Sequence, residues 1–388
     1  MAKKLRTGFE LPFSNATDQN YGKTFPNNTP YLFNNLVDGF YNLNGIIKNR
    51  STSMSISTST NHNFIYSNYA RTKIGTRGTF YSGNQDPNGW SLLAFDLSQF
   101  ANGFFANYWL SANNSSTMYL RLIYLNNGID FYTGYIDNSG TNTVIRIEKN
   151  GVDQSSYDIG YKLDTIVVSS GTYYNTHVSV DNSGVISLSI NGSTALTHAT
   201  GIAFSSFTQL GACMARGQNT AFIDDLAIND GSGSTDNGMP NSIRGYNFFD
   251  QSTLDSQTGF STVGGSTILA NLTDGDDSTR VNCSNDLSEM NFSLPTLSAT
   301  GMSETASNFL KIDAINIYAR QIEATKANSV LKAKITDSVT NANREENISL
   351  PLTVANDSTT MFDDGSNDFS LSNLDSGNLD LKITFDKP

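Results

Sequence analysis

Cysteine, histidine and proline are scarce in this sequence of 388 residues. The chain has two cysteines, Cys213 and Cys283, with three histidines and eight prolines. Two cysteines cannot build a disulfide framework, and no group of cysteines and histidines has the spacing of a zinc site. We therefore expect both cysteines to be small buried residues that fill gaps in the interior.

Charged residues are also few, and positive charge is the scarcer sign. Asp, Glu, Lys and Arg make up 15% of the chain, against roughly a quarter in an average protein. The 24 Lys and Arg residues stand against 36 Asp and Glu residues, which leaves a net charge of -12 at pH 7. This balance repels phosphate backbones and anionic lipid headgroups, so we expect no nucleic acid among the partners.

Long apolar segments are missing as well. No uninterrupted apolar run approaches the roughly 20 residues that a membrane-spanning helix needs. The basic residues that follow Met1 are not succeeded by the apolar stretch of a signal peptide. We expect a chain that neither inserts into a membrane nor carries a signal peptide.

The sequence has instead the pattern of short β-strands joined by tight turns. Apolar and polar residues alternate in 118–132, 143–151 and 176–192, and turn sequences rich in Asn and Gly interrupt or close each segment. In the second segment, Ile145 and Ile147 fall on one side of the expected strand. Many short strands at this spacing are typical of a sandwich or jelly roll.

A Gly-rich stretch at 229–240 is the best boundary between two domains, because it offers almost nothing to bury. We expect a larger domain at 1–230, a linker at 231–250 and a smaller domain at 251–388. Turn and strand patterns continue beyond the linker, so the second domain is also expected to be β-structure.

The clearest strands of the second domain are expected at 310–320, 329–336 and 379–385. Residues 319–334 also fit a helix by propensity. We favour strands there because the alternation that begins at Ile312 enters the segment, and 337–343 has the composition of a turn.

Three segments of the first domain carry a resemblance to a known family. They are 6–10, Arg-Thr-Gly-Phe-Glu; 173–192, an aromatic residue before a hairpin that ends in Asn-Gly; and 222–244, where Ile-Asp-Asp precedes a short apolar strand, Asp-Gly-x-Gly and a closing Arg. They resemble the laminin-G-like, concanavalin-type jelly roll of structural proteins from tailed bacteriophages. Residues 272–281 and 312–320 are similar to the second β-sandwich domain that such virion proteins often carry.

The resemblance implies an all-β chain, with a concanavalin/laminin-G-like jelly-roll sandwich followed by a second, smaller β-sandwich domain. One departure is that Tyr173 or Tyr174 stands where the family's hairpin usually has Trp. An aromatic of similar area can fill the same core position, so the fold expectation is unchanged.

The implied function is that of a bacteriophage virion structural protein on the particle surface. We expect a tail-associated adhesin or appendage that attaches to host-surface glycans, assembled in the host cytoplasm. A capsid decoration or cement protein is the alternative, and a bacterial lectin-like binding protein is a further one. Other virion proteins are the expected partners, and free strand edges favour a homo-oligomer, with a trimer as the expected state.

Enzymatic activity is not expected. A glycosidase needs two carboxyl groups about 5–9.5 Å apart, yet Glu148 is the only glutamate between Glu10 and Glu289. Asp224 and Asp225 are adjacent, so on a regular strand they face opposite sides. The sequence therefore predicts a binding protein without catalysis.

Trp90, Tyr66 and Tyr69 are the candidate ligand-binding residues. Aromatic rings at the rim of a sandwich can stack on sugar rings, and Trp90 follows a turn-rich segment at 84–89. The competing interpretation is that these rings belong to the core.

Asp274, Asp276 and Asp277 are the candidate metal ligands. Calcium takes carboxylate and carbonyl oxygens from Asp-rich loops of this kind. The same Asp-Gly sequence is also a good turn former without any ion, so calcium and a plain turn are both left open.

Overall fold

The computed structural model describes residues 3–7, 47–50, 55–59, 63–66, 69–72, 75–79, 93–112, 119–137, 142–158, 174–215, 221–231, 252–273, 278–296, 312–362 and 369–387. The chain folds into two compact units, with the main division between Gly245 and Tyr246. That division falls within the predicted linker at 231–250. The linker residues after Gly231 lie outside the described ranges, so the linker itself stays a prediction.

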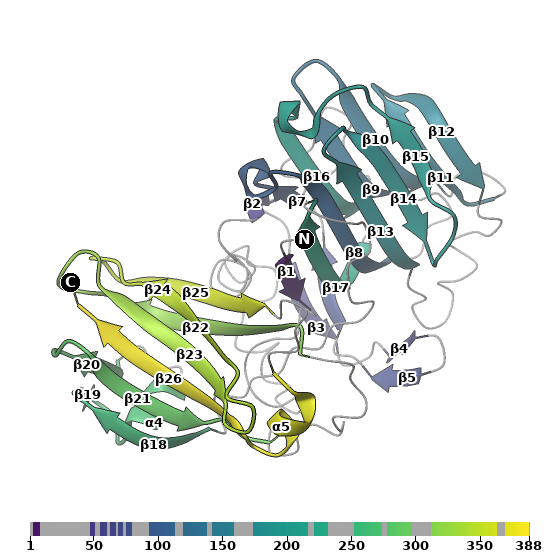
Figure 1. The fold of residues 1–388 in the computed structure, drawn as a ribbon. Coiled ribbons are helices and arrows are strands. Elements are labelled where there is room, and N and C mark those ends of the chain that lie inside the picture. Colours follow the sequence, from purple (N-terminus) through teal and green to yellow (C-terminus); the bar gives the residue numbers. More distant parts are fainter. Residues whose placement is uncertain are drawn as a thin grey trace. The chain divides into compact units, whose positions relative to one another are not determined.

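The first unit is built from two antiparallel sheets (Figure 1). The six-stranded sheet has the order β1 (Lys3–Thr7), β17 (Ala221–Asp230), β8 (Gly103–Ala112), β13 (Tyr174–Asp181), β14 (Val185–Ile190) and β15 (Leu196–Ala199). The seven-stranded sheet has the order β12 (Val152–Asp158), β11 (Val144–Lys149), β10 (Phe131–Asp137), β9 (Tyr119–Asn126), β16 (Gln209–Ala215), β7 (Leu93–Phe95) and β2 (Ile47–Arg50).

Neighbouring strands in each sheet are often distant in sequence. The strand β8 lies between β17 and β13, while β9, which follows it in the chain, lies between β10 and β16 of the other sheet. The chain therefore passes repeatedly from one sheet to the other, as in a jelly roll. The expected all-β sandwich is confirmed.

Aromatic side chains fill the space between the two sheets. The ring of Phe104 on β8 lies 5.3 Å from the ring of Phe95 on β7 and 5.3 Å from that of Phe100. The hydroxyl of Tyr108 donates to the carbonyl oxygen of Leu122 on the opposite sheet at 3.2 Å. Each such buried aromatic contributes about 1.5–3 kcal/mol through burial alone, so this layer holds the sheets face to face.

The expected hairpin turns are confirmed. Asn150 and Gly151 have φ angles of 52° and 82°, the left-handed pair that a two-residue turn between β11 and β12 requires. Between β9 and β10, the Oδ1 atom of Asn127 accepts the N–H groups of Ile129 and Asp130. These turns set the alignment of β9 with β10 and of β11 with β12.

Two short strand pairs complete the described part of this unit. The pairs are β3 (Ser55–Ser59) with β6 (Gly75–Thr79), and β4 (Asn63–Tyr66) with β5 (Tyr69–Thr72). The described helical turns are η3 (Leu97–Gln99) and η4 (Phe204–Ser206).

The second unit is a smaller β-sandwich around one apolar core. Its five-stranded sheet has the order β18 (Thr253–Thr258), β21 (Ser288–Ser293), β26 (Leu379–Asp386), β23 (Val330–Asp337) and β24 (Asn343–Ser349). Two further pairs join β22 (Ala314–Ile322) to β25 (Ala355–Phe362) and β19 (Phe260–Val263) to β20 (Arg280–Cys283). The described helices are α4 (Ile268–Thr273) and α5 (Leu371–Asp375).

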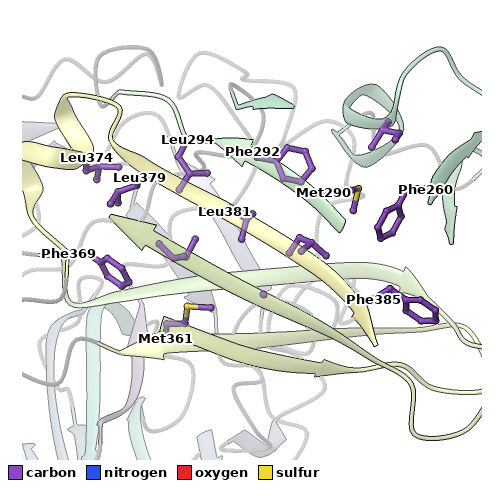
Figure 2. Close-up of a cluster of buried hydrophobic side chains, with 14 residues drawn as sticks. Phe260, Met290, Phe292, Leu294, Met361, Phe369, Leu374, Leu379, Leu381 and Phe385 are labelled. Carbon is purple, nitrogen blue, oxygen red and sulfur yellow. The ribbon is translucent and has the colours of Figure 1, made fainter. Parts of the chain in front are cut away.

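Figure 2 shows how this second core is assembled. Phe292 of β21 and Leu381 of β26 come from the five-stranded sheet, Met361 comes from β25, and Leu374 comes from α5. The alternating burial along β21 and β26 follows directly from the period of two in a strand.

Residues 319–334 comprise the end of β22, a turn and the start of β23. The strand interpretation of this segment is therefore confirmed over the helical one. No helix of the described residues is both long and apolar enough to cross a membrane.

The expectation for the cysteines is met only in part. Cys283 is half-buried and packs against the edge of the second core, where its Sγ lies 3.4 Å from the carbonyl oxygen of Asn285. The side chain of Cys213 lies outside the described residues.

The alignment of β17 with β8 shifts between Asp224 and Ala227. A bulge of this kind interrupts regular alternation. The inference that Asp224 and Asp225 face opposite sides assumed a regular strand, and it stays a prediction because their side chains are not described.

Candidate functional site

The described residues include only the backbone of two of the three predicted ligand-binding aromatics. Tyr66 ends the strand β4, Tyr69 begins the strand β5, and the two residues are paired with each other. Their side chains, and the whole of Trp90, lie outside the described residues. Their role in ligand binding stays a prediction.

The predicted calcium ligands Asp274, Asp276 and Asp277 also lie outside the described residues. Within the ranges that the structure describes, no group of three or more His, Cys, Asp or Glu side chains is placed to hold a metal ion. Calcium at 274–277 therefore stays a prediction.

The structure assembles a different set of polar side chains, on the outer side of the seven-stranded sheet. Tyr132 of β10 points to the interior, because its ring lies 5.9 Å from that of His198 in the other sheet. Its neighbour Thr133 therefore points outward. We use the name polar face for the outward-facing residues of β9, β10, β11 and β12 that share this side: Arg121, Tyr124, Asn126, Thr133, Tyr135, Asp137, Arg146, Glu148 and Asp153.

The strand alignment sets these side chains in rows across the sheet. Thr133 is paired with Tyr124 on one side and with Glu148 on the other, and Glu148 is paired with Asp153. In the next row, Tyr135 lies between Arg121 of β9 and Arg146 of β11. Directly opposite residues in a sheet lie about 4.5–5.5 Å apart at Cβ, so the polar side chains of each row adjoin one another.

Ion pairs and hydrogen bonds connect the rows diagonally. The Nε atom of Arg146 lies 2.9 Å from Oδ2 of Asp137, and its Nη1 atom lies 2.6 Å from Oδ2 of Asp153. The hydroxyl of Tyr135 donates to Oε1 of Glu148. Arg146 therefore holds two carboxylates, while the third is held by a phenol.

Burial raises the pKa of Tyr135 above its ordinary value, and the hydrogen bond to Glu148 raises it further. The phenol consequently keeps its proton at neutral pH and serves as a hydrogen-bond donor, not as a base.

The β9 side of the polar face is more deeply buried. Arg121 and Tyr124 have no solvent-accessible surface, and the guanidinium carbon of Arg121 lies 4.7 Å from the centre of the Tyr124 ring. A cation over an aromatic ring at this distance is attracted to its π-face. Nδ2 of Asn126 donates to the Tyr124 hydroxyl at 3.0 Å and to Oε1 of Gln209 at 3.1 Å.

Thr133 stands out among these residues. It is 4% exposed, and its Oγ1 atom is buried without a hydrogen-bond partner in the described structure. A buried hydroxyl in this condition costs about 1–3 kcal/mol of stability. Native structures pair nearly all buried polar atoms with protein, water or another group, so this hydroxyl has room for a partner that the described structure does not supply.

Sequence reasoning missed this site because it considered Glu148 alone. Glu148, Asp137 and Asp153 are separated in sequence and meet only through the alignment of three strands. The alternation in 143–151 did place Arg146 opposite to Ile145 and Ile147, and this was the available signal for an outward-facing charged side.

Comparisons with known proteins identify no family. No family model and no curated protein matches the chain. Solved structures that match include a galectin from Caenorhabditis elegans, at 16% identity over 33% of this chain and 84% of that chain, with a TM-score of 0.24. An alginate lyase from Pseudomonas aeruginosa matches at 18% identity over 43% and 87%, with a TM-score of 0.30.

A carbohydrate-binding module from Bacillus subtilis matches at 12% identity, over 40% of this chain and 92% of that chain, with a TM-score of 0.27. At these identities and TM-scores, neither an activity nor a ligand carries over to this chain.

Proposed function

We propose that this chain is a glycan-binding protein that does not cleave its ligand, and that the polar face is the binding surface. The observation that carries the proposal is the buried hydroxyl of Thr133, which has no partner in the described structure and lies between Tyr124 and Glu148. A sugar hydroxyl both donates and accepts, so it can satisfy this group.

The surroundings of Thr133 fit a sugar in other respects. Aromatic rings bind the C–H faces of sugars. The half-buried ring of Phe131, which lies 6.3 Å from the ring of the buried Tyr124, offers such a surface. Asn126, Phe131 and Glu148 are only half-buried, whereas the Thr133 hydroxyl is covered. A ligand would therefore reach Thr133 from their side, by moving one of these side chains aside. A few placed polar groups beside aromatic surface are typical of small-ligand sites.

The same contacts support binding without cleavage. Glycoside hydrolysis needs one carboxylic acid that gives up a proton and a second carboxylate that acts as base or nucleophile. Asp137 and Asp153 both pair with the guanidinium of Arg146, and Glu148 accepts a hydrogen bond from the hydroxyl of Tyr135. All three carboxylates are thus engaged as hydrogen-bond acceptors.

The resemblance of 6–10, 173–192 and 222–244 to phage structural domains supports a place on a virion. We propose a surface-exposed, tail-associated adhesin or appendage that attaches to host glycans as a homo-oligomer, in which several weak contacts add by avidity. Capsid decoration is the second candidate. Electron microscopy of particles labelled with antibody to this chain separates the two by position on tail or head.

The proposed function is tested by titrating the purified chain against a panel of glycans, followed by chromatography of the incubated glycans. We expect saturable binding to at least one glycan and no shortened products. Shortened products would overturn the non-catalytic part of the proposal, and absence of binding across the panel would overturn the whole of it.

A further inference from the structure

We infer that the polar face selects neutral, hydroxyl-rich glycans and rejects uronate and sulfated glycans. The inference rests on the proposed function and concerns the charge of the ligand. It follows from how the accessible charged groups of the polar face are already paired.

The accessible charge on the polar face is mainly negative. Arg146 and Glu148 are half-buried and Asp153 is exposed, whereas Asp137 and Arg121 are buried. The reachable groups are thus one guanidinium and two carboxylates, and the exposed carboxylate of Asp158 lies on the same side of the sheet at the end of β12. A glycan carboxylate or sulfate arriving here meets net repulsion, in addition to that of the chain's charge of -12.

The accessible cation is also already neutralised. Two nitrogen atoms of Arg146 are bonded to carboxylates, Nε to Asp137 and Nη1 to Asp153. These charge-assisted bonds are among the strongest hydrogen bonds in proteins. An anionic sugar that binds the remaining N–H groups of the guanidinium would lie beside Asp137 and Asp153 and be repelled by both.

A neutral sugar meets no such cost. Its hydroxyl groups can donate to Glu148 or Asp153, and carboxylate acceptors make stronger bonds with hydroxyl donors than neutral acceptors do. The Thr133 hydroxyl lies in the same row, between Tyr124 and Glu148. Recognition by such bonds depends little on ionic strength, because the ligand carries no charge to be screened.

The variant Asp153→Asn separates this inference from a purely structural role of Arg146. It removes one of the two carboxylates from the guanidinium, so affinity for an anionic glycan is expected to rise. The matched control is Asp158→Asn, which removes a carboxylate from the same strand, where Oδ2 of Asp158 accepts from Asn142 at 2.6 Å.

The test measures binding of the full chain to dextran, laminarin, alginate and heparin by biolayer interferometry at low and moderate salt. We expect wild type to bind a neutral polysaccharide, with affinity changing less than about twofold with salt, and to bind neither alginate nor heparin. Asp153→Asn should raise alginate affinity at least about fivefold through the freed guanidinium, and Asp158→Asn should not.

Binding of alginate or heparin by wild type as tightly as a neutral polysaccharide would overturn the charge selection and leave the proposed function standing. The same holds if Asp153→Asn gains no alginate affinity. Absence of binding to every polysaccharide here and in the wider glycan panel would instead overturn the proposed function itself.

Discussion

His198 lies between the two sheets of the first unit, in contact with the ring of Tyr132. Lys149, which is paired with Asp130, lies 5.7 Å from the centre of the same ring. Partial burial lowers the pKa of His198 below its ordinary value of 6.5, and the nearby charge of Lys149 lowers it further. The folded protein therefore binds a proton at His198 less readily than the unfolded chain does.

The sign of the pH effect follows from this difference. Because the unfolded state takes up the proton first, the free energy of unfolding is expected to fall as pH drops below 6.5. Thermal unfolding of wild type and His198→Gln between pH 5 and 7 measures it. His177→Gln serves as a control. If His198→Gln loses as much stability on acidification as wild type does, His198 is not the group responsible.

At the scale of single residues, much of the interior could be predicted from the sequence and the site could not. Val178, Ile186 and Leu188 occupy apolar positions of the alternation in 176–192, and all are buried. Thr133 lacks any local signal, because its unsatisfied hydroxyl depends on neighbours that come from other strands. A property that arises from register between strands is not visible in one segment of sequence.

The strand β10 has a glycine, Gly134, at its centre, and the packing of this strand requires that the position has no side chain. A Cβ atom at Gly134 would lie 2.7 Å from Cδ1 of Leu188 on the facing sheet and 2.9 Å from Cγ2 of Ile123 on the neighbouring strand. Those distances are closer than carbon atoms approach. The two sheets therefore pack at their observed separation because position 134 has no side chain.

Gly134→Ala is expected to destabilise the first unit by about 1–3 kcal/mol through overpacking. Urea unfolding measures the change. In a Leu188→Ala background the contact with Leu188 disappears while that with Ile123 remains, so the cost of Gly134→Ala should shrink to about half. An equal cost in both backgrounds would show that strand conformation, and not the contact with Leu188, is responsible.

At the scale of elements, the turns explain why sequence reasoning succeeded. Asn150-Gly151 and Asn191-Gly192 adopt the left-handed conformation that these residue types tolerate best, so the hairpins could be predicted from the sequence. Bulges explain why the exact alignment of the strands could not. The alignment of β9 with β10 shifts after Gly134, and that of β11 with β12 shifts after Ile147. These shifts determine which polar side chains become neighbours.

The whole molecule is expected to consist of two independently stable units. Each has its own described core, one between the sheets of the jelly roll and one around Phe292 and Leu381. Limited proteolysis should therefore cut first within or beside 230–240, because that stretch is rich in glycine and poor in apolar side chains. Mass spectrometry of the early fragments checks this. A resistant full-length chain, or first cuts within 110–200, would contradict it.

The central claim, that a ligand completes the hydrogen bonding of the polar face, is tested most directly by one paired comparison. Ser155 offers the matched control, because its Oγ is also buried without a partner in the described structure, but it lies on the inner side of the same sheet, opposite Ile147. Thr133→Val and Ser155→Ala each remove such a hydroxyl, so each should keep or raise the free energy of unfolding, by up to about 1 kcal/mol.

The measurement is the glycan dissociation constant of both variants, taken on samples whose unfolding free energy is determined in parallel. The account predicts that Thr133→Val weakens binding about tenfold, the equivalent of one hydrogen bond of roughly 1.4 kcal/mol, while Ser155→Ala binds as wild type does. Wild-type affinity in Thr133→Val, or an equal loss in both variants, would contradict it.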